Sequence, residues 1–192
     1  TVYGKEIAFY TPDTTKYKGI SIGSQVWMSK NLDVSRFRNG DQIPKVPGDN
    51  WQAVTTPAWK WINDDSVTYS GYGKLYNWYA VTDPRGLAPQ GWHIPAMTEF
   101  DSLRAAVNSC GGCLKEIGTA HWLTPNTGAN NITGFTALPN NGNLPSMFAC
   151  FWSKDSYTTP TGVALRLYYD YNNLEVEYFP KYIGISVRCV QD

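Results

Sequence analysis

Apolar and polar positions alternate along much of the second half of the chain. Leu165 and Leu167 flank one polar residue, and Leu174 and Val176 flank another. A period of two places the apolar side chains on one face of a strand and the intervening side chains on the other. Clusters of Gly, Pro, Asn and Thr separate several such runs. The strand candidates are residues 135–138, 148–152, 163–169, 174–179 and 184–190.

Helical periodicity is confined to the middle of the chain. Phe100 and Leu103 recur at helical spacing in "TEFDSLRAAV", where Thr98 is the candidate cap. The run "GKLYNWYAV" at 73–81 predicts an earlier helix. The first third of the chain holds short β-like runs between turn-rich segments. Together these patterns predict an α+β fold with two short helices, small antiparallel sheets and a high proportion of loops.

Length and composition narrow the class of protein. The 192 residues fit a single domain, with residues 1–16 as a lead-in. Lys plus Arg number 16, as do Asp plus Glu, so no positive excess favours nucleic acid. The 8 Trp, 13 Tyr and 7 Phe are typical of irregular cores and of recognition surfaces. No stretch approaches the roughly 20 apolar residues of a membrane span, so we expect no membrane insertion.

The cysteines leave their chemistry open. Cys110-Gly-Gly-Cys113 has the spacing of a redox motif or of half a zinc site, but no second C-x-x-C or His pair completes a tetrahedron. We therefore expect neither metal nor cofactor. With Cys150 and Cys189 the chain allows three pairings, among which the sequence does not choose. We expect Cys189 to be buried and at least one disulfide to form in an exported protein.

Catalytic residues are hard to find. The chain has two histidines, and the apolar neighbours of His93 favour a structural imidazole, while His121 has no companion acid at a telling spacing. Nucleophile-elbow, metalloprotease, phosphate-loop and dinucleotide patterns are absent from the sequence. We expect no catalytic residues and no enzymatic activity.

Six ordered blocks carry a family resemblance. They are "YKGISIGSQVWMSKNLDV" at 17–34, "YGKLYNWYAV" at 72–81, "LAPQGWHIPAMTEFDSL" at 87–103, "GFTALPNNG" at 134–142, "FWSKDSY" at 151–157 and "GISVRCVQD" at 184–192. This set resembles the Fibrobacter succinogenes major paralogous domain family over residues 17–192. The resemblance implies a C-type-lectin-like fold whose last strand returns beside the first. We expect four tryptophans of these blocks to be scaffold: Trp27, Trp78, Trp92 and Trp152.

Two further resemblances are weaker. The calcium-binding tripeptides of sugar-binding lectins are absent, and "WINDDS" only echoes one of them, so Asn63, Asp64 and Asp65 are expected to form a turn. "GWHIPAMTEF" also resembles a segment of formylglycine-generating enzymes, which use cysteine chemistry. That family's C-terminal catalytic block has no counterpart, so such an oxidase remains a lesser alternative.

The strongest functional signal lies near the C-terminus. Residues 168–173 are all Tyr, Asp or Asn, residue types whose codons differ at one position. Variable proteins of diversity-generating retroelements, some of which resemble this family, diversify such codons ahead of "SVRC". Tyr and Asn also dominate antibody paratopes, because they combine contact area with adaptable hydrogen bonds. The predicted ligand-binding residues are Lys154, Asp155, Tyr157, Arg166, Tyr168, Tyr171, Asn172, Asn173, Glu175, Glu177, Tyr178 and Tyr182.

The sequence therefore predicts a ligand-binding domain of the adhesin or receptor-binding type. Its expected setting is extracellular or on a cell surface, including display on a phage particle, and its expected partner is a protein or a glycan. A second hypothesis is a structural module that assembles into a surface filament or phage tail. The oligomeric state is left open, and light scattering distinguishes the two hypotheses.

Overall fold

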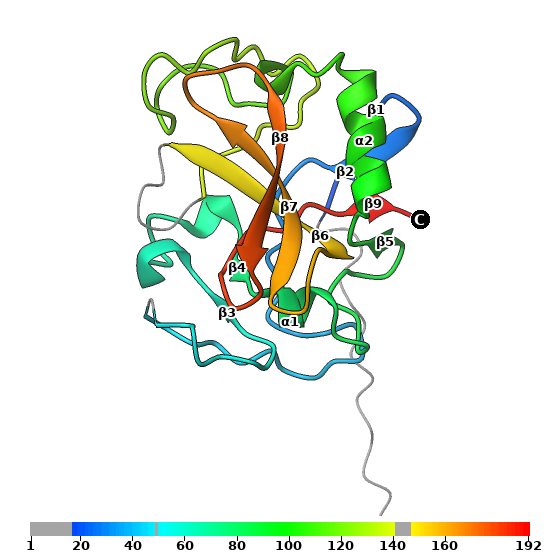
Figure 1. Ribbon diagram of the computed structural model, residues 1–192, viewed down its shortest axis with the longest axis vertical. Coiled ribbons are helices and arrows are strands. Elements are labelled where there is room, and N and C mark those ends of the chain that lie inside the picture. Colours follow the sequence, from blue (N-terminus) through cyan, green and yellow to red (C-terminus); the bar gives the residue numbers. More distant parts are fainter. Residues whose placement is uncertain (1–16, 49, 141–146) are drawn as a thin grey trace, which may run out of the picture.

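The computed structural model describes residues 17–48, 50–140 and 147–192 (Figure 1). Within them, short helices and strands are joined by long loops, which confirms the predicted α+β class. The elements are β1 (Gly19–Ile22), β2 (Gln25–Met28), β3 (Trp59–Lys60), η1 (Ile62–Asp64), η2 (Ser70–Tyr72), β4 (Leu75–Tyr76), α1 (Trp78–Val81), β5 (Trp92–His93), α2 (Met97–Ala106), η3 (Gly111–Cys113), β6 (Phe148–Ser156), β7 (Thr161–Tyr168), β8 (Leu174–Pro180) and β9 (Val190–Gln191).

Three antiparallel sheets organise the described residues. One has the strand order β1-β2-β9-β5, the second pairs β3 with β4, and the third has the order β6-β7-β8. The β6-β7-β8 sheet crosses the middle of the molecule, with α2 beside it (Figure 1). Its long strands provide the platform on which the candidate site is built.

The earlier helix is much shorter than predicted. The sequence predicted a helix over 73–81, whereas Tyr76 belongs to strand β4 and the helix begins only at Trp78. The cause is Asn77, whose Oδ1 accepts hydrogen bonds from the backbone N–H groups of Ala80 and Ala58. A buried side chain that caps the helix and also fixes a neighbouring loop ends the strand and starts the helix at one residue.

Helix α2 matches the prediction but is capped differently. It begins at Met97, so Thr98 lies inside the first turn and does not cap it. Glu99 accepts a hydrogen bond from the backbone N–H of Ala96, and Asp155 accepts one from that of Met97. Strand β6 therefore helps to cap α2 with a carboxylate, the group that a helix N-terminus favours.

The segment 184–191 connects all three sheets and is called the closing segment. Ile185 exchanges backbone hydrogen bonds with Tyr76 of β4, and the carbonyl of Ser186 accepts one from Trp152 of β6. Val190 then pairs with Trp27 of β2 and with β5. The prediction of a continuous strand over 184–190 was wrong, since only its end joins a sheet. The predicted strand at 135–138 is likewise only a bridge between Lys115 and Ala137.

The β6-β7-β8 sheet separates two hydrophobic cores. One contains Trp152 and Trp92, and the other contains Trp27, which stacks on Phe100 of α2. These three tryptophans are buried, as predicted for scaffold residues. Trp78 is only partly buried against the first core, which makes it a weaker scaffold residue than predicted.

Arg188 is buried inside the molecule with neutral partners. Its Nε and Nη2 donate to Oδ1 of Asn31 at 2.9 and 2.6 Å, and its Nη1 donates to the carbonyls of Met28 and Phe135. The guanidinium also lies against the rings of Phe135 and Phe151. Burial lowers the pKa of Arg188 to about 9. This side chain joins the closing segment to the loops after β2 and before β6.

The cysteines form one disulfide. Cys110 and Cys113 are joined, whereas Cys150 and Cys189 are buried thiols. Cys189 is fully buried, as predicted. Burial raises the pKa of both thiols well above the ordinary value. Among the described residues, none of the helices has the length and apolar character needed to cross a membrane.

Candidate ligand-binding surface

The strand register places the predicted residues on both faces of the β7–β8 hairpin. Leu165 pairs with Val176, and Arg166 pairs with Glu175. Leu165 is fully buried, while Arg166 and Glu175 are partly exposed on the opposite face. The alternation read from the sequence therefore gave the correct register for this part of the sheet.

Aromatic rings are stacked on the outer end of this face. The ring of Tyr168 stacks on that of Phe148 across the strand pair, with centroids 5.7 Å apart. Tyr168 also stacks on Tyr171, with centroids 5.2 Å apart and planes 11° from parallel. The guanidinium of Arg166 lies over the rings of Phe148 and Tyr168. Stacked rings with a cation over them form a rigid patch with few free rotamers.

Two carboxylates complete the patch. Nη2 of Arg166 donates to Oε2 of Glu175 at 2.8 Å and pairs with Oε1 of Glu177 at 2.7 Å. The hydroxyl of Tyr171 donates to the same Glu175 oxygen at 2.7 Å. One arginine faces two glutamates, so the group has one negative charge in excess. The Arg166 surface comprises Phe148, Arg166, Tyr168, Tyr171, Glu175 and Glu177.

These contacts change the titration of the surface. Hydrogen bonds from Arg166 and Tyr171 hold the pKa of Glu175 below its ordinary value. Burial and the hydrogen bond to Glu175 raise the pKa of Tyr171 to about 12. At neutral pH the phenol is therefore a hydrogen-bond donor and the carboxylate is ionised. Tyr171 and Glu175 keep these protonation states over the physiological range.

The disulfide turn supports the loop between β7 and β8. The backbone N–H of Gly111 donates to the carbonyl of Asn172 at 2.7 Å, and that of Gly112 donates to its Oδ1 at 2.6 Å. A Cβ on Gly112 would lie 2.1 Å from the carbonyl oxygen of Gly128. The C-G-G-C spacing therefore lets two loops approach the turn closely. Asn172, predicted to contact ligand, is occupied in holding its own loop.

Lys115 supports the same loop from the interior. It is fully buried, and its ammonium donates to the carbonyls of Tyr168 and Tyr171 at 2.8 and 3.3 Å. Burial lowers the pKa of Lys115 to about 8, and the nearby charge of Asp170 opposes this shift. Lys115 thus holds the backbone of Tyr168 and Tyr171 from the interior of the protein. Sequence reasoning missed Lys115, because a lysine followed by glutamate reads as solvent-exposed.

Two predicted tyrosines lie on the opposite face. Tyr178 pairs with Val163 in the register, so it faces away from Glu175 and Glu177. The ring centroids of Tyr178 and Tyr157 lie 4.3 Å apart, and Tyr178 is 48% and Tyr157 64% exposed. The prediction of one continuous face was therefore wrong, because Tyr178 lies three positions, an odd number, after Glu175 in the strand.

The remaining predicted residues are dispersed. Asp155 is occupied at the start of α2, and Lys154 lies at the rim of a cavity described below. Asn173 is exposed in the loop after β7, and Tyr182 is partly exposed after β8. Phe148 was missed as a member of the surface, although its alternation with Cys150 and Trp152 placed it on the same face.

The structure gives no metal site among the described residues. None of their His, Cys, Asp and Glu side chains gather in groups of three or more. Asp65 accepts hydrogen bonds from the backbone N–H groups of Val67 and Thr68, and Asp64 accepts one from Gly48. These acids thus stabilise turns, as the sequence predicted.

Fold and surface together define a class: a loop-rich α+β domain that presents a rigid aromatic patch on one sheet. The chain belongs to the Fibrobacter succinogenes major domain family, whose model matches residues 20–191. This range includes the whole Arg166 surface. No curated protein and no solved structure matches the chain.

Proposed function

We propose that this domain is a non-catalytic binding module that recognises a protein or a glycan through the Arg166 surface. The observation that carries the proposal is the stack of Phe148, Tyr168 and Tyr171 beside paired charges. Aromatic residues and arginine are the side chains that most often anchor recognition interfaces. Here the stack is already ordered, so binding requires little additional loss of rotamer freedom.

The excess negative charge indicates the kind of partner. Glu175 and Glu177 outnumber Arg166, and the neighbouring Asp170 is exposed. A protein that presents lysine or arginine is the complementary partner, and exposed ring faces also attract cations. A glycan would use the same rings for stacking and the carboxylates as hydrogen-bond acceptors.

The setting we propose is extracellular or at a cell surface. The Cys110–Cys113 disulfide supports it, since disulfides persist mainly in oxidising compartments. The family resemblance supports a C-type-lectin-like scaffold and a diversified loop at 168–173. An oxidase of the formylglycine-generating kind is not proposed, because the two remaining thiols, Cys150 and Cys189, are buried.

Two double variants test which face binds. A glycan and surface-protein array first identifies a partner for the wild type. Tyr168→Ala/Tyr171→Ala is expected to weaken the affinity for that partner more than tenfold, because loss of an anchor commonly costs about 2 kcal/mol or more. Tyr157→Ala/Tyr178→Ala removes two tyrosines from the other face and is expected to bind normally. Thermal unfolding of both variants shows that folded protein is compared.

Assembly is the second candidate function. Tyr157 and Tyr178 form an exposed aromatic pair on the face opposite the Arg166 surface. Exposed aromatic groups of this kind also occur where subunits meet. Light scattering at micromolar concentration tests this idea, since a module that assembles through this pair becomes monomeric in Tyr157→Ala/Tyr178→Ala.

A further inference from the structure

A cavity of about 370 Å³ lies away from the Arg166 surface. It is lined by the loop after α1, by β5, by Arg38 and by Lys154 of β6. Lys154 and Phe148 are six residues apart on β6, which corresponds to roughly 20 Å along an extended strand. The cavity is therefore separate from the proposed recognition surface, and the inference below does not depend on that surface.

Part of the cavity lining is apolar. Val81, Leu87 and Ile94 line it, and each is at least 90% buried, with exposed fractions of 4%, 2% and 7%. A volume near 370 Å³ falls at the lower end of the range for small-molecule sites. A compact organic group fits such a space in contact with these side chains.

Arg38 holds a fixed positive charge at the cavity. Its Nε donates to the carbonyl of Ala88 at 3.0 Å, and its Nη2 donates to those of Pro89 and Trp92 at 3.3 and 2.9 Å. Among the described residues, Nη1 has no hydrogen-bond partner and no carboxylate pairs with this guanidinium. Neutral carbonyls thus orient this exposed side chain, and no carboxylate of the described residues pairs with it.

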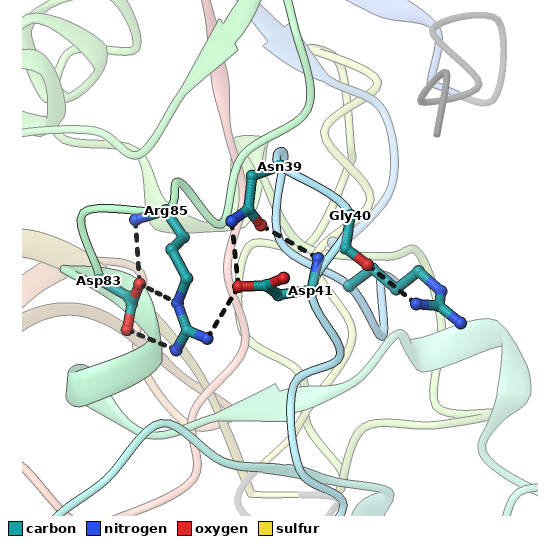
Figure 2. Close-up of polar contacts among 6 residues, drawn as sticks. Asn39, Gly40, Asp41, Asp83 and Arg85 are labelled. Atoms are coloured by element: carbon teal, nitrogen blue, oxygen red, sulfur yellow. Dashed lines mark hydrogen bonds and ion pairs between the residues drawn. The ribbon is translucent and has the colours of Figure 1, made fainter. Parts of the chain in front are cut away.

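The carboxylate that lines the cavity is paired with another arginine. Asp83 accepts hydrogen bonds from Nε and Nη2 of Arg85 at 2.8 and 3.0 Å, and Arg85 extends to Asp41 (Figure 2). Asn39 in turn donates to Asp41, which keeps this carboxylate turned toward Arg85 (Figure 2). The pKa of Asp83 is held below its ordinary value by Arg85. Asp83 is therefore paired with Arg85 and not with Arg38.

Lys154 adds a second positive charge. Its side chain is exposed, it lines the cavity, and no acid within the described residues pairs with it. Its backbone N–H donates to the carbonyl of Pro95, which fixes the strand at this point. His93 also lines the cavity. Its Nδ1 is hydrogen-bonded to Oδ1 of Asp192 and its Nε2 to Oε1 of Glu99, so both ring nitrogens already have partners. The cations available to a ligand are Arg38 and Lys154.

We propose that this cavity binds a small organic anion, a carboxylate attached to a compact apolar group. The carboxylate meets Nη1 of Arg38 and the ammonium of Lys154, while the apolar group covers Val81, Leu87 and Ile94. A planar guanidinium held in one orientation suits a planar carboxylate. Acetate lacks the apolar group and benzamide lacks the charge, so both bind more weakly than benzoate.

Titrations followed by amide NMR test the site with three probes: benzoate, benzamide and acetate. Benzoate is expected to cause saturable shifts at Thr82, Gly86 and Lys154, and benzamide and acetate only small ones. Benzoate shifts confined to other residues, or equal affinity for benzamide, would overturn the proposal. An absence of saturable shifts at millimolar benzoate would also overturn it.

Charge variants give the second readout. Lys154→Gln is expected to weaken the affinity for benzoate two- to fivefold, which corresponds to the energy of an exposed ion pair. Lys30→Gln removes another exposed lysine, one that does not line the cavity, and is expected to leave the benzoate affinity unchanged. Equal affinity in wild type and Lys154→Gln would count against the site. Tyr168→Ala/Tyr171→Ala retains the cavity, so its benzoate affinity should equal that of the wild type.

Discussion

Two arginines form the centres of two very different regions. Arg188 is 2% exposed, and it is held by carbonyls and the amide of Asn31, with no carboxylate among its partners. Arg166 lies at the surface and is held by Glu175 and Glu177. Both guanidinium groups also contact aromatic rings.

The difference shows how one side chain serves two purposes. Inside, a carboxylate would add a second ion to desolvate, whereas carbonyls orient the guanidinium by dipoles that the fold already has. At the surface, Arg166 is 21% exposed and its two glutamates about a third, so water screens the ion pairs only in part, and Glu175 and Glu177 set the charge of the surface. The region of Arg188 therefore holds parts of the fold together, whereas that of Arg166 determines the charge at the surface.

The largest expected effect concerns the interior. Trp152→Ala removes a fully buried ring that also donates from Nε1 to the carbonyl of Tyr76. We expect it to lower the free energy of unfolding by about 3–5 kcal/mol. Trp78→Ala, at a partly exposed position, is expected to lower it by less. Urea denaturation measures both, and equal losses would mean that exposure does not set the cost.

A matched pair of arginine variants tests the comparison directly. Arg188→Met leaves the buried acceptors of Asn31, Met28 and Phe135 without a donor, and each such group costs about 1–3 kcal/mol. We expect a total loss of at least about 3 kcal/mol. Arg166→Met is expected to lose less than about 1 kcal/mol, because its acceptors reach water. Similar losses in the two variants, measured by denaturation, would contradict the division into fold and surface.

Lys115 connects the interior to the surface and gives a pH test. Its pKa is about 8 in the folded protein and 10.5 ordinarily, so the unfolded chain binds more protons between these values. The contribution of Lys115 to the free energy of unfolding therefore rises with pH in that window. Relative to Lys115→Met, the free energy of unfolding of the wild type is expected to increase by on the order of 2 kcal/mol between pH 8 and 10.5. A constant difference across the window would show that burial does not shift this lysine.

The smallest expected effect separates two neighbouring asparagines. Asn172→Ala loses the hydrogen bond from Gly112 and is expected to cost about 1 kcal/mol. Asn173→Ala changes an exposed side chain and is expected to stay within about 0.5 kcal/mol. Thermal unfolding resolves the pair. A larger loss of stability in Asn173→Ala than in Asn172→Ala would show that Asn173, and not Asn172, stabilises the loop.

Local sequence patterns correctly predicted those features that depend on residues close together in the chain. Alternation around Leu165 gave the strand faces, and periodicity around Phe100 gave α2, because both signals need only a few residues. The family's tryptophans gave three buried scaffold positions. The same alternation rule would have excluded Tyr178 from the face of Glu175 had it been followed to the end of β8.

What the sequence did not predict depends on distant residues. Asn77 ends a strand because Ala58 and Ala80 both donate to it, and Lys115 is buried because the loop of Tyr171 closes over it. These contacts link residues up to 56 positions apart. No local pattern records such a contact, so the short helix and the supported loop became visible only in three dimensions.

The closing segment has a consequence for the order of synthesis. It follows every other element along the chain, yet β2, β4, β5 and β6 each bond to it. A ribosome therefore exposes these strands before the residues that join them have been made. Until then the unpaired edges are open to other chains. We expect a nascent chain that ends at residue 183 to remain protease-sensitive and one that includes residue 191 to become resistant.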